Sequence, residues 1–195
     1  MSNAPPRDEE PPRLHIRDAG VMRALAHQAR LAILEHLMTS EAATATECAA
    51  ICGLSPSATS YHLRALAKVG LVEQAPSRGD GRERLWRTRI KGFQVDAEHT
   101  ADPAARAAER ELIDAFLIRD EARTRQWLGR REQAAPEWYR AATFNEMILL
   151  LSAAELEELT AKIIEMTRAY GKVRRRDPPP DARTVSMLLR VFPTD

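Results

Sequence analysis

Small and apolar residues recur at helical spacing between residues 55 and 70. This face consists of Thr59, Leu63, Leu66 and Val69. Ser55 and Pro56 are residue types preferred at a helix N-terminus, and Gly70 is typical of the residue that ends a helix. The pattern therefore predicts an amphipathic helix over residues 56–69 with both ends defined.

A shorter helix is predicted directly before this one. Thr44 and Glu47 have the spacing of a capping box, and the small and apolar residues 48–52 end at Gly53. A short helix, a tight turn and a capped second helix are together typical of a helix-turn-helix.

The residues after the second helix have the pattern of a β-hairpin. Residues 71–76 and 82–89 have strand-like composition, and residues 77–81 have the composition of a hairpin tip. We call residues 71–89 the wing. Trp86, in its second strand, is interpreted as a packing residue because a large indole is more often buried than stacked on a base.

The polar face of helix 56–69 is small, hydroxylated and basic. It carries Ser57, Ser60, Tyr61, Arg64 and Lys68. Residues 54–92 contain eight Lys and Arg against three Asp and Glu, an excess of five positive charges, whereas the whole chain carries a net charge of +1. Short side chains can approach base edges and cations bind phosphates, so the pattern indicates double-stranded DNA with this helix in the major groove.

The arginines of the wing extend this prediction. Arg78 lies at the predicted tip and is a candidate for minor-groove or backbone contact. Arg82 and Arg84, on the returning strand, are candidates for phosphate contacts.

Several separately spaced motifs, over about residues 19–95, resemble the ArsR-type winged-helix repressors. They are the run 22–37, the sequence Ser-Tyr-His-Leu at 60–63, Gly-Leu-Val at 70–72 and Asp-Gly-Arg at 80–82. The resemblance implies a homodimer that binds a two-fold symmetric operator and represses transcription until a signal weakens binding. By motif position it places four residues at or near the DNA surface, namely Ser57, Ser60, Tyr61 and His62.

Two positions depart from the family pattern. Tyr61 stands where the family often has arginine, which removes a bidentate contact to guanine. Metal-sensing members carry a cysteine pair at the start of the preceding helix, where this chain has Ala45 and Glu47. We therefore expect no bound metal and no other cofactor.

Two residue types in this region allow two interpretations each. Cys48 and Cys52 share one face of a short helix, so they either form a thiol- or metal-responsive sensor or pack as small apolar residues. His62 either forms a hydrogen bond within the protein domain or contacts a DNA base.

The C-terminal half has a different pattern. It predicts a long helix over residues 104–133, an apolar strand ending at Leu151, a helix from Ser152 to Tyr170, and a final strand over residues 185–192. The two strands are expected to pair. Among its aromatic and apolar residues, Trp138, Tyr139, Phe144 and Met147 are interpreted as core or as the lining of an effector pocket.

The predicted fold is mainly α with small β, in three parts. Residues 1–17 are an arm, residues 18–96 a winged helix-turn-helix domain, and residues 102–195 a dimerisation or regulatory module with a strand-helix-strand unit. The chain shows no membrane-spanning stretch, no signal peptide and no catalytic motif, so we expect a cytoplasmic DNA-binding regulator and no enzyme. The alternative is a winged helix whose basic face binds an acidic protein.

Overall fold

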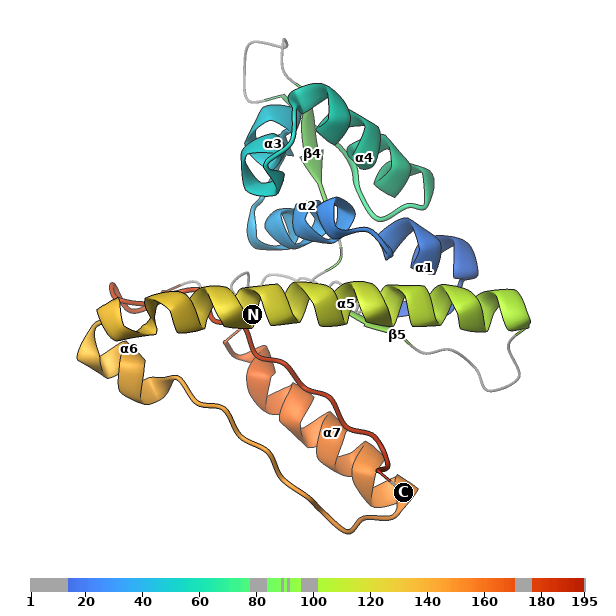
Figure 1. Cartoon of the computed structure of the whole chain (residues 1–195). Coiled ribbons are helices and arrows are strands. Elements are labelled where there is room, and N and C mark those ends of the chain that lie inside the picture. The colour runs from blue at the N-terminus through green and yellow to red at the C-terminus, as the bar shows by residue number, and fades with distance from the viewer. Residues whose placement is uncertain are drawn as a thin grey trace, which may run out of the picture. The chain divides into compact units, whose positions relative to one another are not determined.

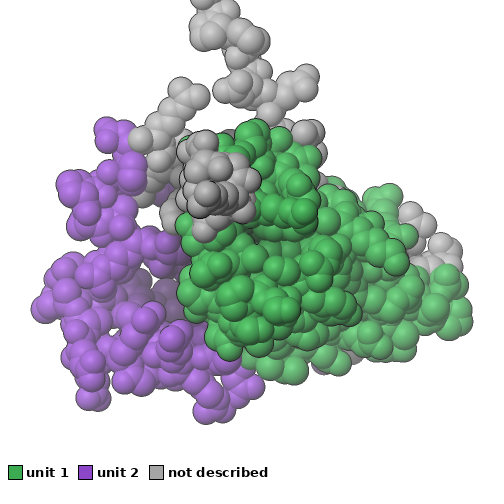
Figure 2. Space-filling model, turned by 90° about the horizontal axis from the view of Figure 1, so that it is seen from above, with its two compact units in different colours: residues 1–119 green, residues 120–195 purple. Residues whose placement is uncertain are grey.

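The computed structural model describes residues 14–77, 84–88, 90, 92–95, 102–170 and 177–194. The chain forms two compact units, residues 1–119 and 120–195, shown in green and purple in Figure 2. The boundary falls within one long helix, α5 (Pro103–Arg130), so each unit contains part of it. Among the described residues, no helix is both long and apolar enough to cross a membrane.

Unit 1 consists of helices around a small sheet (Figure 1). Its first four helices are α1 (Ala19–Leu25), α2 (Gln28–Thr39), α3 (Ala45–Cys52) and α4 (Pro56–Lys68). Its strands are β1 (Leu14–Ile16), β2 (Ala43–Thr44), β3 (Glu73–Ala75), β4 (Leu85–Arg87) and β5 (Phe93–Val95). An antiparallel sheet has the order β2-β4-β3, and β1 pairs with β5 in parallel.

The caps predicted for the helix-turn-helix are confirmed. The Thr44 hydroxyl accepts a hydrogen bond from the Glu47 amide at 3.1 Å, while the Glu47 carboxylate accepts from the Thr44 amide at 2.6 Å. Gly53 ends α3 with φ of 64°, and Gly70 follows α4 with φ of 75°. Both glycines adopt the left-handed conformation that a side chain disfavours.

The start of α4 also follows the prediction. The Ser55 hydroxyl accepts from the Ala58 amide at 3.2 Å, and Pro56 occupies the first turn, where no amide hydrogen is required. The observed helix ends at Lys68, one residue before the predicted end.

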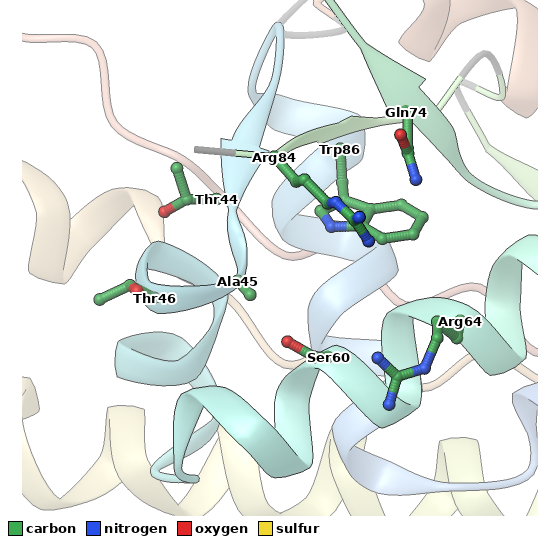
Figure 3. Close-up of a pocket in the computed structure, with 8 residues that line it drawn as sticks. All are labelled: Thr44, Ala45, Thr46, Ser60, Arg64, Gln74, Arg84 and Trp86. Carbon is green, nitrogen blue, oxygen red and sulfur yellow. The ribbon is translucent and has the colours of Figure 1, made fainter. Parts of the chain in front are cut away.

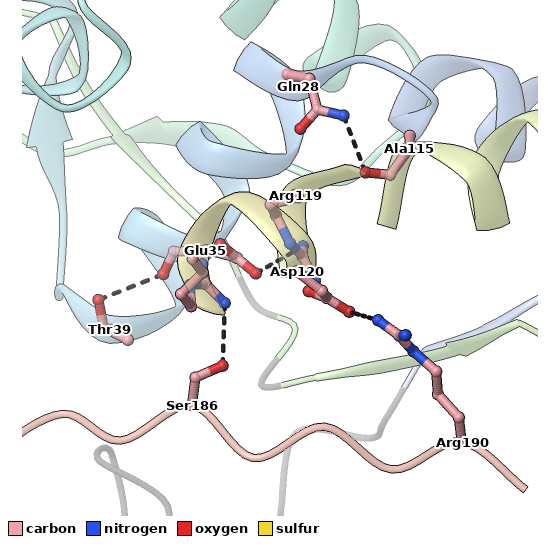
Figure 4. A network of polar contacts seen from close by, with 9 residues as sticks. Gln28, Glu35, Thr39, Ala115, Arg119, Asp120, Ser186 and Arg190 are labelled. Carbon is pink, nitrogen blue, oxygen red and sulfur yellow. Dashed lines mark hydrogen bonds and ion pairs between the residues drawn. The ribbon is translucent and has the colours of Figure 1, made fainter. Parts of the chain in front are cut away.

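The core of unit 1 joins the helix-turn-helix to the first half of α5. Leu34, Leu63, Leu66 and Leu112 are each 0% exposed and belong to one cluster. Polar contacts hold the same elements together: the Gln28 side chain donates to the Ala115 carbonyl at 2.9 Å, and Arg119 pairs with Glu35 at 2.7 Å (Figure 4). The predicted long helix is confirmed, and its first half packs against the helix-turn-helix.

The structure corrects the end of the predicted arm. Residues 14–16 form β1, and Ile16 is 1% exposed within the core. β1 pairs with β5, and the paired residues, such as Leu14 and Phe93, are 79 positions apart in the sequence. Pairing over such a separation leaves no local signal in a three-residue segment, so the periodicity of the sequence did not predict it.

Unit 2 contains the end of α5, a short 3-10 helix (Arg131–Gln133), α6 (Pro136–Ala141) and α7 (Ala153–Arg168). The helix predicted from Ser152 is confirmed, and it begins with a capping box: the Ser152 hydroxyl accepts from the Glu155 amide at 3.3 Å, and the Glu155 carboxylate accepts from the Ser152 amide at 2.8 Å. The pKa of Glu155 is lowered because its carboxylate accepts from the backbone and side chain of Ser152.

The prediction of a strand-helix-strand unit is correct for the helix and wrong for the two strands. Residues 142–152 and 182–194 contain no strand in the described chain and run as irregular, extended segments on either side of α7 in sequence (Figure 1). Their β-prone apolar residues favour strands, but a strand is stable only when it pairs, and the two segments do not pair within this chain.

Candidate nucleic-acid interface

The outward face of α4 presents four polar side chains in a line. Ser57, Tyr61, Arg64 and Lys68 are exposed, and their spacing of four, three and four residues places them on one side of the helix. We call these four residues the outer stripe. Tyr61 is the aromatic residue of the outer stripe, and 61% of its surface is exposed.

The opposite face of α4 is fixed in the core. Thr59, Leu63 and Leu66 are each 0% exposed, and the Thr59 hydroxyl donates to the Ser55 carbonyl at 3.0 Å. A helix anchored on one side in this way holds its outer stripe at a defined height above the domain surface. This is the geometry that a helix needs to enter a major groove.

A pocket of about 240 Å³ lies between the start of α3, α4 and the described part of the wing (Figure 3). It is lined by Thr44, Ala45, Thr46, Ser60, Arg64, Gln74, Arg84 and Trp86. In Figure 3, Ser60 and Arg64 reach it from α4, whereas Gln74, Arg84 and Trp86 reach it from the wing. The pocket thus combines two guanidinium groups with hydroxyl and amide groups.

The two arginines of the pocket have no carboxylate partner among the described residues, whereas a neighbouring arginine has one. Arg87 pairs with Glu73 across β3 and β4, with Nη2 2.7 Å from Oε1. Arg64 and Arg84 are exposed. Unpaired guanidinium groups beside hydroxyls and the first turn of α3 form a surface complementary to an anion such as a phosphate.

His62 does not lie on the outer stripe. It is 9% exposed, and its ring centroid is 4.6 Å from that of His27, on the side of α4 that faces the domain. Its Nδ1 has no hydrogen-bond partner in the described chain, so the expected bond to the scaffold is not made by this atom. The resemblance placed His62 at the DNA surface, but its position in the helix groups it with the buried residues Thr59 and Leu66.

The surroundings of His62 favour its neutral form. Burial lowers the pKa of His62, and the nearby His27 and Arg30 lower it further. Burial and Arg30 also lower the pKa of His27, whose Nδ1 accepts from the Ala29 amide at 3.1 Å and caps α2. Arg30 itself donates to the carbonyl oxygens of Arg23, at 3.0 Å, and of Ala24. Arg30 therefore fixes the corner between α1 and α2.

The two cysteines have the environment of packing residues. Cys48 is 0% exposed, and burial, together with Cys52 and Glu47, raises the pKa of its thiol to about 11. Burial also raises the pKa of Cys52, whose Sγ lies 3.6 Å from the Ala29 carbonyl oxygen. Reactivity and metal binding require the thiolate, so this environment favours the packing interpretation over the sensor.

The structure brings together part of the predicted site. The pocket brings together Ser60, Arg64 and Arg84. The outer stripe contains Ser57, Tyr61 and Lys68, together with Arg64. The described residues do not include Arg78 and Arg82. Thr46 and Gln74 line the pocket but were not predicted. Thr46 is in the first turn of α3, and Gln74 is opposite Trp86 in the β3–β4 register, so strand pairing was the missing information.

The four residues considered for an effector pocket do not form one in the described structure. Phe144 and Met147 are 57% and 73% exposed. Trp138 and Tyr139 instead form cation–π contacts with arginines. The Arg183 guanidinium is 5.0 Å from the centroid of the Trp138 ring, and the Arg131 guanidinium is 4.4 Å from the centroid of the Tyr139 ring. Phe144 and Met147 are therefore not core residues within the described chain.

Comparisons with known proteins identify the same region. A family described as helix-turn-helix domain matches residues 25–75. No curated protein matches the chain in sequence. A solved structure of a possible transcriptional regulator for arsenical resistance is 30% identical over 50% of this chain and 83% of its own, with a TM-score of 0.32.

Two further solved structures are less similar in sequence. RV1404 from Mycobacterium tuberculosis is 20% identical, with 85% of this chain and 86% of its own covered, and a MarR family transcription regulator is 16% identical, with 81% and 80% covered. Both have a TM-score of 0.32, which is too low to indicate that the whole chains share one fold. The chain contains a helix-turn-helix domain, matched by the family over residues 25–75, and the caps, the antiparallel wing strands and the long following helix give it the fold of a winged helix-turn-helix protein.

Proposed function

We propose that this chain is a sequence-specific DNA-binding regulator of transcription that inserts α4 into the major groove. The observation that carries the proposal is the outer stripe of α4, which presents Ser57, Tyr61, Arg64 and Lys68 from a helix whose other face is buried. Arg64 and Lys68 would contact phosphates or guanine, and Tyr61 would donate to a phosphate or contact a thymine methyl group.

The pocket between α3, α4 and the wing supports this orientation. A backbone phosphate that approaches it would meet Arg64, Arg84 and the Ser60 hydroxyl together. Such a contact would set the height of α4 in the groove, while base contacts would come from the outer stripe. The proposal also includes the predicted contacts of Arg78 and Arg82, with the wing on the backbone or in the minor groove.

We propose further that the protein acts as a homodimer on an operator with two-fold symmetry, as a repressor in the cytoplasm. α5 supports the dimer, because Ile113, Leu117 and Ile118 remain 41%, 40% and 60% exposed on it. A small-molecule effector would act by weakening DNA binding. We propose no catalytic activity.

A salt titration tests the proposal. Wild type, the Arg64→Ala/Arg84→Ala double variant and Arg125→Ala are titrated with mixed-sequence duplex DNA at several salt concentrations. Wild-type affinity should fall steeply as salt rises, and the double variant should have a slope lower by about two units, because two phosphate contacts are lost. Arg125 is an exposed arginine paired only with Glu121 on its own helix, so its variant should keep the wild-type slope.

The same titration separates the alternative function. A winged helix that binds an acidic protein would leave the three chains with no measurable DNA affinity even at low salt. That result, or a double variant with the wild-type slope, would contradict the proposal.

A further inference from the structure

Unit 2 exposes apolar side chains that a folded chain normally covers. Twelve large apolar side chains within residues 144–151 and 185–192 are exposed, and Leu150 is fully exposed. The only buried side chain among the described residues of unit 2 is Asp120, at 5%. Exposed apolar patches of this extent mark surfaces that bind a partner.

The backbone of both segments is available for pairing. Within the described chain, residues 144–151 and 185–192 belong to no strand, and no main-chain hydrogen bond is formed by their amides. An extended apolar segment with unpaired amide and carbonyl groups is a template for another strand. The partner must therefore supply a strand, and not only an apolar surface.

Residues 185–192 are held in place by side chains alone. Arg190 pairs with Asp120 at 2.9 Å, and the Ser186 hydroxyl accepts from Arg123 at 3.2 Å, both on α5 (Figure 4). Ser186 and Arg190 are four residues apart, so they lie on the same face of an extended segment. The backbone edge of the segment stays free.

The two segments are complementary in length and charge. Each has eight residues, and each contains one ionisable side chain, Glu146 in the first and Arg190 in the second. Full antiparallel overlap places residue 144 opposite 192 and residue 151 opposite 185. The same register places Glu146 directly opposite Arg190, an oppositely charged cross-strand pair among apolar neighbours.

This register favours a second copy as the source of the partner strand. In a single chain, two strands joined by a helix most commonly pair in parallel, which would not place Glu146 opposite Arg190. Two copies related by a two-fold axis would each offer both segments, so two identical antiparallel pairs would form and no segment would remain unpaired.

We propose that residues 144–151 of one copy pair antiparallel with residues 185–192 of a second copy, so that each copy completes unit 2 of the other. This inference rests on the homodimer of the proposed function and adds a contact surface in unit 2 to the exposed apolar face of α5. It also explains why a chain with a well-capped α7 leaves this unit without a core.

Disulfide trapping between two differently tagged chains tests the pairing without DNA. In a background with Cys48→Ala and Cys52→Ala, one chain carries Ile148→Cys and the other carries Leu188→Cys, two positions that the register places opposite each other. Oxidation of the mixture should link most of the two chains together, because opposite residues in antiparallel strands lie within disulfide distance. Ile148→Cys with Met166→Cys, on exposed α7, controls for random collision and should link at least tenfold less.

A proline variant provides a second measurement that does not depend on the cross-link. Leu149→Pro removes an amide that bonds to nothing within the chain, so it should leave helix content unchanged but raise the dimer dissociation constant at least tenfold by sedimentation. Leu149→Val keeps the amide and should retain the wild-type constant. A monomeric wild type, a dimer unaffected by proline, or linkage no greater than in the control pair would overturn the pairing. The salt titration in the preceding section is independent of these outcomes, so failure of the pairing and failure of DNA binding are distinguished.

Discussion

Units 1 and 2 contain helices with the same local signals but differ in what their apolar residues contact. α3 and α7 both begin with a complete capping box, formed by Thr44 and Glu47 in one and by Ser152 and Glu155 in the other. α3 buries Cys48 and Ala49 in a core that includes distant strands, whereas α7 buries no residue. Capping and amphipathicity are therefore sufficient for a helix, but a domain also requires partners for its apolar face.

The difference indicates a division of roles. Unit 1 brings residues from β1 to the first half of α5 into one cluster and so holds α4 in position without help from another chain. Unit 2 leaves its apolar residues exposed, which is typical of a surface completed by assembly. Recognition of DNA is thus expected to depend on unit 1, and strand pairing between copies on unit 2.

Truncation of one apolar side chain in each unit should show the largest difference between the two units. Leu63→Ala removes a side chain that is 0% exposed on α4 and should lower the free energy of unfolding by about 2–5 kcal/mol, through lost burial and a cavity. Met166→Ala, at 74% exposure on α7, should change it by less than about 0.5 kcal/mol. Urea unfolding followed by circular dichroism measures both, and equal losses would contradict the comparison.

Lowering the pH should reduce the stability of unit 1 by less than the Leu63→Ala substitution does. The folded-state pKa values of His27 and His62 lie below the ordinary 6.5, so the unfolded chain binds protons more readily. The stabilisation is complete above pH 6.5 and is lost as the pH falls from there through the lowered folded-state pKa values. No histidine occurs in residues 120–195, so α7 contributes nothing to this dependence.

The melting temperatures of wild type and of two variants, measured between pH 7.5 and pH 5, test this effect. His62→Gln should reduce the loss of stability on acidification, and Tyr61→Phe, which keeps both histidines beside Arg30, should retain the wild-type loss. A pH dependence that is the same in wild type and His62→Gln would show that the histidine pair is not its source.

Most of the helix-turn-helix could be predicted from sequence because its signals are local. Ser55, Pro56 and Gly70 fixed the ends of α4 to within one residue, and Gly53 fixed the turn. The spacing of Ser57, Tyr61, Arg64 and Lys68 also predicted their common face. For His62 the helical period, which groups it with Thr59 and Leu66, predicts burial, whereas motif resemblance places it at or near the DNA surface; in the structure it is 9% exposed.

The features that sequence did not predict depend on pairing between distant segments. β1 and β5 are three residues each, and Gln74 reaches the pocket only because β3 pairs with β4. The strand expected to end at Leu151 and the strand expected at residues 185–192 have the right composition but have no partner strand within the described chain. Composition indicates which residues can form a strand, whereas the partner decides whether they do.

Hydrogen exchange at two protein concentrations tests the division between the units most directly. Below the dissociation constant of the dimer, amides of α4 should be protected while those of residues 144–151 and 185–192 exchange rapidly, because they have no hydrogen-bond partner. Well above it, the two segments should become protected and α4 should change little. Protection of both segments in the dilute chain, or rapid exchange at every concentration, would contradict the account.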